Sequence, residues 1–341
     1  MSEHASNSKP DPTSIVIDTH AHVFLPEVLG ACGAAGPELS IDDGVQSFRA
    51  GAYTIRGVKF QNSPMSDLWQ RLALMDRMGI THQILSPYPM LYFYDQPAAD
   101  CVNFCARHNY ATAALVKGSN GRLAGLATLP MQDPAAAVTE LKRALDELDL
   151  RGACVGGRFG ERELSDPTYD SLWDILEERQ LPVIVHTGPL DGGNRNFKKW
   201  DLELVVGFAM DETLAITQLV FGGVLDRHPR LTAIVPHGGG FAPYARSRFE
   251  MALSKRAWGS GLLSRPFDDI WNQMVFDCLV HNDLTLDYLV KAHGSERVVL
   301  GTNFAAWDQD DHIVDQVKSL NMSTENRDAI LGINAKRIFR L

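Results

Sequence analysis

Short apolar runs that are rich in β-branched residues recur along the chain and mark its buried strands. The first is Ile15-Val16-Ile17, and the others begin near residues 83, 123, 152, 183, 232, 274 and 298. Runs of this length that are bounded by polar residues predict strands buried on both faces. We therefore expect eight strands.

The segments between these runs have helical periodicity. Leu68, Leu72 and Met75 fall at helical spacing, and Gly79 suits the position just after a helix. Further helices are expected over residues 98–115, 134–148, 167–178, 212–225 and 284–291. Eight strands that alternate with helices predict an α/β fold, a (β/α)8 TIM-type barrel. A doubly wound open sheet is the alternative, although no G-x-G-x-x-G motif follows the first strand.

Two segments fall outside this alternation. Residues 25–65 follow the first strand, are rich in glycine and small residues, and predict a small insertion. Within it, the alternating run 52–56 predicts a short hairpin. Residues 1–14 are polar and lack the basic and apolar regions of a signal peptide, which indicates a disordered tail. Residues 15–341 are then expected to form one domain.

Composition and charge narrow the class of protein. The chain has 341 residues, of which 45% are hydrophobic and 22% charged, as is typical of a globular protein, and no apolar run reaches membrane-spanning length. The five cysteines are scattered without a C-x-x-C pair, which fits a reducing cytoplasm. The net charge of -10 disfavours nucleic acid and anionic membranes as partners, so an anionic substrate needs a local arginine cluster.

Polar side chains directly follow several of the predicted strands. His20 and His22 end the first strand and, two residues apart, point to the same side. The later strands end in His186, His237, Asp277 (with His281 beyond it) and Asn303. Because the carboxyl ends of barrel strands open onto one mouth, these groups should converge there. Neutral imidazoles suit zinc and similar transition metals, so we expect a metal site.

Longer stretches give the chain a resemblance to a known family. The matching stretches are residues 18–22, 129–132, 199–224, 236–240, 278–281 and 300–302. Together they span nearly the whole chain after residue 14, and the His-Gly-Gly-Gly stretch at 237–240 is the most specific of them. In these stretches the chain resembles the amidohydrolase superfamily, and within it the decarboxylase branch.

The resemblance implies a metal site and a proton carrier. His20, His22 and His186 correspond to zinc ligands, and His237 to a histidine that binds or activates the metal's water and shuttles protons. Members with two metals carry a bridging lysine or glutamate on strand four. The run 152–157 offers neither, so one Zn²⁺ per chain is implied, with another divalent transition metal as the alternative.

The resemblance also implies how a carboxylate substrate is held. Arg248 lies at the position of an arginine that reaches into a neighbouring subunit's site, which implies a homodimer. Arg56, in the expected insertion, is similar to a second carboxylate-binding arginine. A small-molecule carboxylate is then the expected partner.

The chain departs from the family at Asn303, where the pattern has an aspartate that ligates the metal and accepts a proton. The asparagine carbonyl can still approach a metal, but the amide cannot act as a general base. The residue is either an inactivating substitution or a natural variant, and the divergent flanking run 304–308 favours the second. Asp308 then supplies the missing carboxylate, unless it only caps a helix.

These residues predict a metal-dependent, non-oxidative decarboxylase of an unsaturated or aromatic carboxylic acid. A metal-dependent hydrolase or hydratase on the same scaffold is the alternative, because fold alone does not fix function. A non-catalytic metal protein is a third hypothesis, supported only by Asn303. Water attack depends most on the missing aspartate, which favours decarboxylation. The aromatic run 88–94 predicts a flat, apolar pocket wall.

Overall fold

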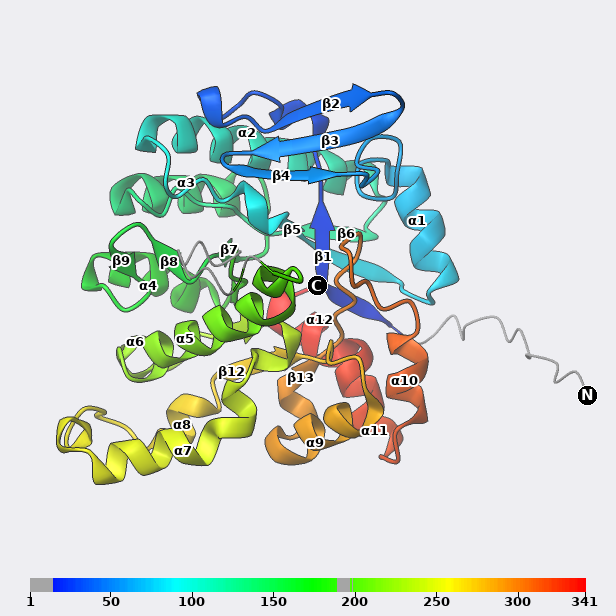
Figure 1. The fold of residues 1–341 in the computed structure, drawn as a ribbon. Coiled ribbons are helices and arrows are strands. Elements are labelled where there is room, and N and C mark those ends of the chain that lie inside the picture. The colour runs from blue at the N-terminus through cyan, green and yellow to red at the C-terminus, as the bar shows by residue number, and fades with distance from the viewer. Residues whose placement is uncertain (1–14, 189–196, 198) are drawn as a thin grey trace, which may run out of the picture.

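The computed structural model describes residues 15–188, 197 and 199–341 (Figure 1). The expected tail over residues 1–14 lies outside this range. Within it, eight parallel strands form two sheets, in the orders β1-β5-β6 and β7-β10-β11-β12-β13. These strands are β1 Ile17–Val23, β5 His82–Pro87, β6 Leu123–Gly125, β7 Ala153–Val155, β10 Val183–Val185, β11 Ala233–Val235, β12 Met274–Asp277 and β13 Val298–Val299. The eight strand starts predicted from the apolar runs are confirmed to within two residues.

The two sheets meet at both pairs of edges. Ala127, after β6, forms a parallel bridge with Ala153 of β7. At the other side, Ala21 of β1 forms a parallel bridge with Phe304, beyond β13. The strands therefore follow one another in chain order, without the reversal that defines a doubly wound sheet. All eight carboxyl ends consequently open on the same face.

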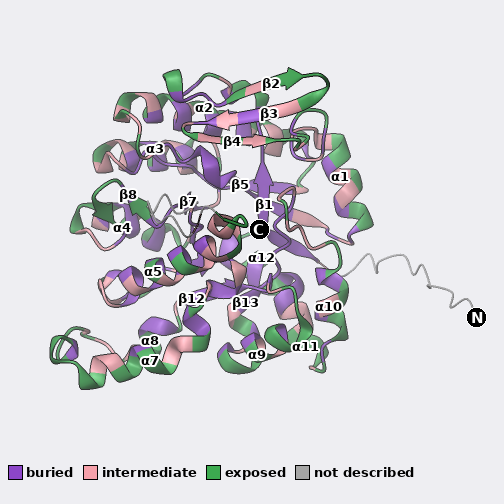
Figure 2. Cartoon of the chain, in the orientation of Figure 1, coloured by how far each residue is buried: buried purple, intermediate pink, exposed green. Residues whose placement is uncertain are grey.

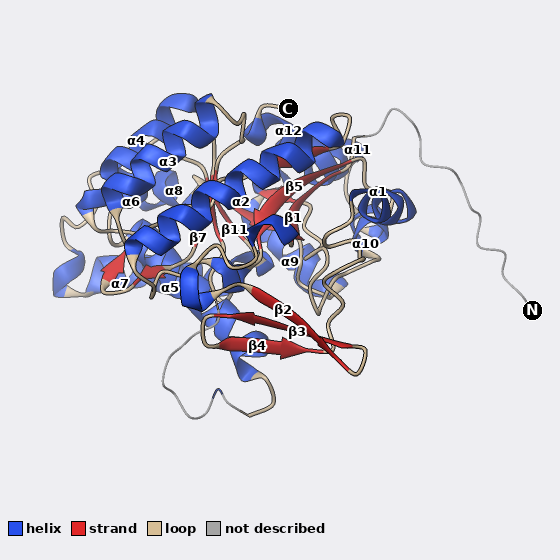
Figure 3. Cartoon of the chain, turned by 90° about the horizontal axis from the view of Figure 1, so that it is seen from above, coloured by secondary structure: helices blue, strands red, loops and turns tan. Residues whose placement is uncertain are grey.

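Helices surround the strands, and the strands themselves are buried (Figures 2 and 3). The helices are α1 Leu68–Arg77, α2 Ala98–Gly118, α3 Pro134–Asp146, α4 Asp170–Arg179, α5 Phe208–Val220, α6 Val224–Arg227, α7 Ala242–Lys255, α8 Phe267–Trp271, α9 Asp283–His293, α10 Ile313–Ser319, α11 Thr324–Asp328 and α12 Asn334–Phe339. One buried cluster receives side chains from or next to every parallel strand, including Ile17, Ile184 and Val299. Ile338 and Phe339 of α12 join this cluster.

The segment between β1 and α1 forms a separate antiparallel sheet. Its strands are β2 Glu38–Asp42, β3 Val45–Ala50 and β4 Tyr53–Arg56, in the order β2-β3-β4, and Figure 1 shows them in blue above the end of β1. Phe48 of β3 stacks on Phe60 with ring centroids 4.5 Å apart, which ties this sheet to the following loop. A second small antiparallel pair, β8 Arg158–Phe159 and β9 Arg162–Glu163, follows β7.

The helix predicted over 212–225 begins earlier than expected. A π-helical turn, η6 Glu203–Gly207, runs directly into α5, so Glu212 lies inside the helix rather than at its start. By length and composition alone, the continuous segment Glu203–Arg227 is apolar enough to cross a membrane, where the sequence pattern indicated no such run. In this fold, its Asp211 and Glu212 are buried.

A chain of buried polar contacts links β1 to the loop after β13 and to α1. Asp18 accepts hydrogen bonds from the Thr302 hydroxyl at 2.7 Å and from Gln83 at 2.9 Å. Gln83 in turn accepts from the guanidinium of Arg71, which is buried on α1. Arg71 also lies over the ring of Phe304, 4.6 Å from its centroid. These contacts fix the loop after β13 against β1.

Candidate metal centre and pocket

Four imidazole rings converge at the carboxyl ends of the strands. His20 and His22 come from β1, His186 directly follows β10, and His237 lies just after β11. The centroid of the His20 ring lies 5.1, 4.9 and 5.0 Å from those of His22, His186 and His237. The histidines that the sequence placed at separate strand ends therefore share one site.

Three of these rings are oriented by an acceptor behind Nδ1. His20 donates to Asp277 Oδ2 at 2.7 Å, His186 to the Thr187 carbonyl at 2.9 Å, and His22 to the Pro87 carbonyl at 3.2 Å. A ring that donates through Nδ1 keeps the lone pair on Nε2. All three rings thus present the form of imidazole that binds a metal.

These residues fit a bound cation. Ligand atoms of His20, His22 and His186 lie within 4.8 Å of one another, and the Nε2 atoms of His20 and His186 are only 3.0 Å apart. Two lone pairs at that separation repel unless a cation lies between them. Burial, together with the neighbouring histidines, lowers the pKa of His22 and His186 well below the usual value and keeps both neutral.

Asp277 holds both a ligand ring and the loop of the fourth histidine. Its Oδ2 accepts from His20, while its Oδ1 accepts from the backbone N–H of Gly238 at 2.9 Å. Burial alone would raise the pKa of Asp277, but the hydrogen bonds from His20 and Gly238 and the nearby His237 outweigh it and lower the pKa. The carboxylate therefore stays ionised behind His20, an arrangement that increases the basicity of a metal-binding imidazole.

His237 is paired with Glu212, a residue to which the sequence assigned no role. His237 donates through Nδ1 to Glu212 Oε1 at 2.7 Å, and Glu212 is fully buried on α5. Burial lowers the pKa of His237, but the Glu212 carboxylate and its hydrogen bond outweigh this and raise it to about 9. His237 is therefore protonated near neutral pH, in contrast to His22 and His186.

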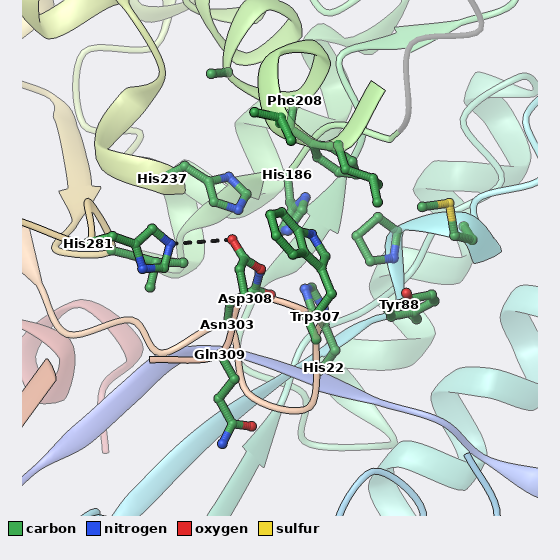
Figure 4. Close-up of a pocket in the computed structure, with 17 residues that line it drawn as sticks. His22, Tyr88, His186, Phe208, His237, His281, Asn303, Trp307, Asp308 and Gln309 are labelled. Carbon is green, nitrogen blue, oxygen red and sulfur yellow. Dashed lines mark hydrogen bonds and ion pairs between the residues drawn. The ribbon is translucent and has the colours of Figure 1, made fainter. Parts of the chain in front are cut away.

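Asn303 and Asp308 meet at the edge of the site. Asn303 donates through Nδ2 to Asp308 Oδ1, and its own Oδ1 is buried without a hydrogen-bond partner among the described residues. Asp308 Oδ2 lies 3.4 Å from Nε2 of His281, an interaction drawn as a dashed line in Figure 4. An unpartnered buried acceptor is costly unless it meets a cation or water, so this oxygen also fits a metal ligand.

The pocket above the histidines has a volume of about 560 Å³. It is lined by His22, Tyr88, Pro89, Met90, His186, Leu204, Val205, Phe208, Ala209, His237, Leu279, His281, Asn303, Ala306, Trp307, Asp308 and Gln309 (Figure 4). Tyr88 and Met90 come from the aromatic run that was predicted to form a wall.

The two predicted substrate-binding arginines are not among these lining residues. Arg56 is exposed on β4, and Arg248 is exposed on α7. The structure of one chain therefore brings together the predicted metal ligands, His237, Asn303 and Asp308, but neither arginine. A role for Arg248 in catalysis requires a second subunit.

Several residues of the site had only weak sequence signals. Glu212 is one of two adjacent acids in an otherwise apolar helix, and a buried charge there needs a partner. Trp307 and His281 follow strand ends but lie in loops, where no periodicity indicates the direction of a side chain. Only their common pocket shows that they face the histidines.

Comparison with known proteins places this site in context. Residues 17–341 match the model of a family described as amidohydrolase. The 2-amino-3-carboxymuconate-6-semialdehyde decarboxylase of Dictyostelium discoideum is 30% identical over 251 residues, covering 72% of this chain and 69% of that protein.

Solved structures of decarboxylases align with almost the whole chain. A 2,6-dihydroxybenzoate decarboxylase in complex with 2,6-dihydroxybenzoate aligns with a TM-score of 0.77 at 25% identity, covering 96% of this chain and 100% of the other. A dihydroxybenzoic acid decarboxylase from Polaromonas sp. JS666, with bound manganese, aligns with a TM-score of 0.79 at 23% identity, covering 96% and 98% of the two chains.

Proposed function

This chain belongs to the amidohydrolase family, and we infer that it is a metal-dependent, non-oxidative decarboxylase of an aromatic or unsaturated carboxylic acid. The observation that carries this function is the convergence of four adjacent histidines. Ligand atoms of three of them lie within 4.8 Å of one another, while the fourth donates through Nδ1 to the buried Glu212. Such a site combines a place for a cation with a proton donor. The relatives named decarboxylases support the same carbon–carbon lyase activity.

We propose one divalent metal per chain, held by His20, His22 and His186, with the carbonyl oxygen of Asn303 as a fourth ligand. The metal supplies Lewis acidity toward the oxygen atoms of a bound acid. Three imidazoles favour zinc, whereas the Polaromonas structure carries manganese. Elemental analysis of the purified protein distinguishes the two metals, and two metals per chain would contradict the assignment.

His237 is the proposed proton donor. Its Nε2 gives a proton to the carbon that bears the carboxylate, while Glu212 stabilises the charge on Nδ1. The carbon–carbon bond then breaks, its electron pair returns to the organic product, and CO₂ leaves. One carboxylate and one proton become one C–H bond and one CO₂, so no oxidant is consumed.

We propose that Asp308 accepts the proton in place of the aspartate that the family pattern has at position 303. Its carboxylate is in direct contact with Asn303 and faces His281. Burial raises the pKa of Asp308, but His281 and His237 outweigh burial and lower it, so the group stays ionised. It can therefore accept a proton from water, and this proton replaces the one that His237 gave to carbon.

We propose a homodimer in which Arg248 enters the partner's site and holds the substrate carboxylate. Arg248 lies on α7, where Tyr244 and Met251 are exposed large apolar residues. Exposed apolar residues grouped on one helix are typical of an interface. Arg56, on β4, is the proposed second carboxylate-binding residue. Guanidinium groups suit this task because they bind carboxylates through two parallel hydrogen bonds.

The bridges at both sheet edges further support a closed (β/α)8 barrel over residues 15–341, with residues 25–65 as its insertion. A dispersed set of free, buried cysteines supports a cytoplasmic location. Barrel strands that close in this way place all catalytic groups on one rim.

The activity is tested with the metal-loaded protein and a panel of hydroxybenzoates and muconate semialdehydes. We expect CO₂ release without oxygen uptake, and loss of that release in His237→Gln. Oxygen-18 from solvent water that appears in the organic product would instead identify a hydrolase or hydratase. No conversion of any acid, with one metal bound, would support a non-catalytic protein.

A further inference from the structure

The pocket above the histidines is much larger than a simple benzoate needs. A cavity of about 150 Å³ holds a benzene ring, whereas this pocket has about 560 Å³. Its polar groups are the histidines, Asn303, Asp308 and Gln309, together with the phenol of Tyr88. Most of its remaining lining, including Met90, Phe208 and Leu279, is apolar. A ring placed at the histidines therefore leaves apolar space unfilled.

Two apolar side chains at the pocket are held in water-exposed positions. Trp307 is 62% exposed and Val205 57% exposed, although both line the pocket. They come from unrelated elements, the loop after β13 and the turn η6, and Figure 4 shows Trp307 projecting into the pocket. Apolar surface that is exposed at the rim of a pocket is typical of a ligand-binding subsite.

The loop that carries Trp307 is anchored on both sides. Phe304 is completely buried beneath Arg71. The backbone N–H of Ala305 donates to the Gln309 side chain at 2.6 Å, and that of Asp310 to the Thr302 carbonyl at 2.9 Å. Trp307 is thus presented by a fixed turn, so the indole is available to a ligand without rearrangement of the backbone.

The charges of the pocket select against a second carboxylate. Among the described lining residues no lysine or arginine occurs, and Asp308 is the one carboxylate. A carboxylate in the outer, apolar part would lose its hydration without gaining a cation. Arg248 of the partner subunit and Arg56 are proposed to hold the reacting carboxylate, so the outer pocket suits an uncharged group.

We propose that the outer pocket, lined by Trp307, Val205 and Leu204, is a subsite for an apolar substituent on the substrate ring. The substrate is then an aromatic monocarboxylic acid that carries an alkyl or aryl group on the side away from the metal. This substrate class rests on the proposed decarboxylase function.

Binding of the phenolic products tests the subsite without turnover. On the metal-loaded protein, 5-pentylresorcinol should bind at least tenfold more tightly than resorcinol, because each buried methylene contributes roughly fourfold. 5-(4-Carboxybutyl)resorcinol, of similar length, should lose this gain. Trp307→Ala should reduce the pentyl preference at least threefold. Trp69→Ala removes an exposed tryptophan of α1 that is absent from the pocket lining, and should leave the preference unchanged.

Equal affinity for resorcinol and 5-pentylresorcinol, or an unchanged preference in Trp307→Ala, would overturn the subsite. Turnover separates the two proposals. If 2,6-dihydroxybenzoate and its 4-pentyl derivative both release CO₂ at the same kcat/KM and binding is unselective, the subsite fails while the decarboxylase stands. If 5-pentylresorcinol binds selectively but neither acid releases CO₂, the decarboxylase fails while the subsite stands.

Discussion

Exchanging Asn303 and Asp308 tests how this chain compensates for the missing aspartate. Asn303 donates its amide N–H to Asp308, so Asn303→Asp places a second carboxylate against the first. At a separation of roughly 3 Å and an effective dielectric constant near 20, two unit charges repel by about 5 kcal/mol. A bound cation offsets part of this repulsion. We therefore expect Asn303→Asp to lower kcat at least tenfold, although it restores the family residue.

Asp308→Asn removes the proposed proton acceptor and should lower kcat by roughly 10²–10⁴. The double variant with Asp at 303 and Asn at 308 restores one carboxylate and one amide in exchanged positions. Because the repulsion is then absent, the double variant should recover most of the activity that either single variant loses. Such recovery is a coupling that two independent structural defects do not produce.

The assay is steady-state CO₂ release on one accepted acid, with the metal content of every variant measured in parallel. Asp315→Asn serves as the matched control, since Asp315 is an exposed acid on α10 outside the pocket. The reasoning is refuted if Asn303→Asp equals or exceeds the wild-type kcat. It is also refuted if Asp308→Asn changes kcat by less than about threefold.

Three further predictions follow from other contacts. Asp277→Asn weakens the bond that orients His20, so metal affinity in a competition titration should fall roughly 10–100-fold; unchanged affinity would exclude this role. If Arg248 acts across a dimer interface, mixing inactive Arg248→Ala and His237→Ala subunits should restore about a quarter of wild-type activity. Half of the dimers are then mixed, and each mixed dimer holds one complete site out of two. No restoration would place Arg248 outside the partner's site. Burial lowers the pKa of His108 to about 4, below its unfolded value near 6.5. The unfolded chain therefore binds a proton first as the pH falls, and about 3 kcal/mol of stability should be lost between pH 6.5 and 4. In denaturant titrations, the free energy of unfolding of His108→Leu should fall less steeply with decreasing pH than that of the wild type. An equal slope would contradict this prediction.

The strand arrangement was predictable because each strand is a short apolar run whose neighbours are helices of ordinary periodicity. The metal-site histidines were predictable for the same reason, since each directly follows such a run. A residue at a strand end has a fixed direction, and parallel strands bring their ends to one face. Sequence position therefore translated directly into spatial position for His20, His22 and His186.

The spatial positions of residues on helices and loops could not be predicted in this way. Glu212 was expected at the start of its helix, but α5 begins at Phe208 and places Glu212 one turn inside, where it contacts His237. Arg71 is completely buried, and its partners Gln83 and Phe304 are distant in the sequence, so nothing local distinguished it from a solvated arginine. Arg248 is exposed on α7 and does not line the pocket of its own chain, so its proposed role across an interface stays a prediction.

The hydrogen bond between Asp18 and Thr302 also constrains when the protein can complete its folding. The two residues are 284 positions apart in the sequence. His20 likewise contacts His186, which lies 166 positions later, and Asp277, which lies 257 positions later. Contacts of such separation form late, because the long intervening loop must close first. During synthesis on the ribosome, the first strand carries two of the proposed metal ligands but keeps one edge unpaired until almost the whole chain has emerged. Metal capture is therefore a late event in the biogenesis of this protein, and an incomplete chain cannot acquire the finished centre.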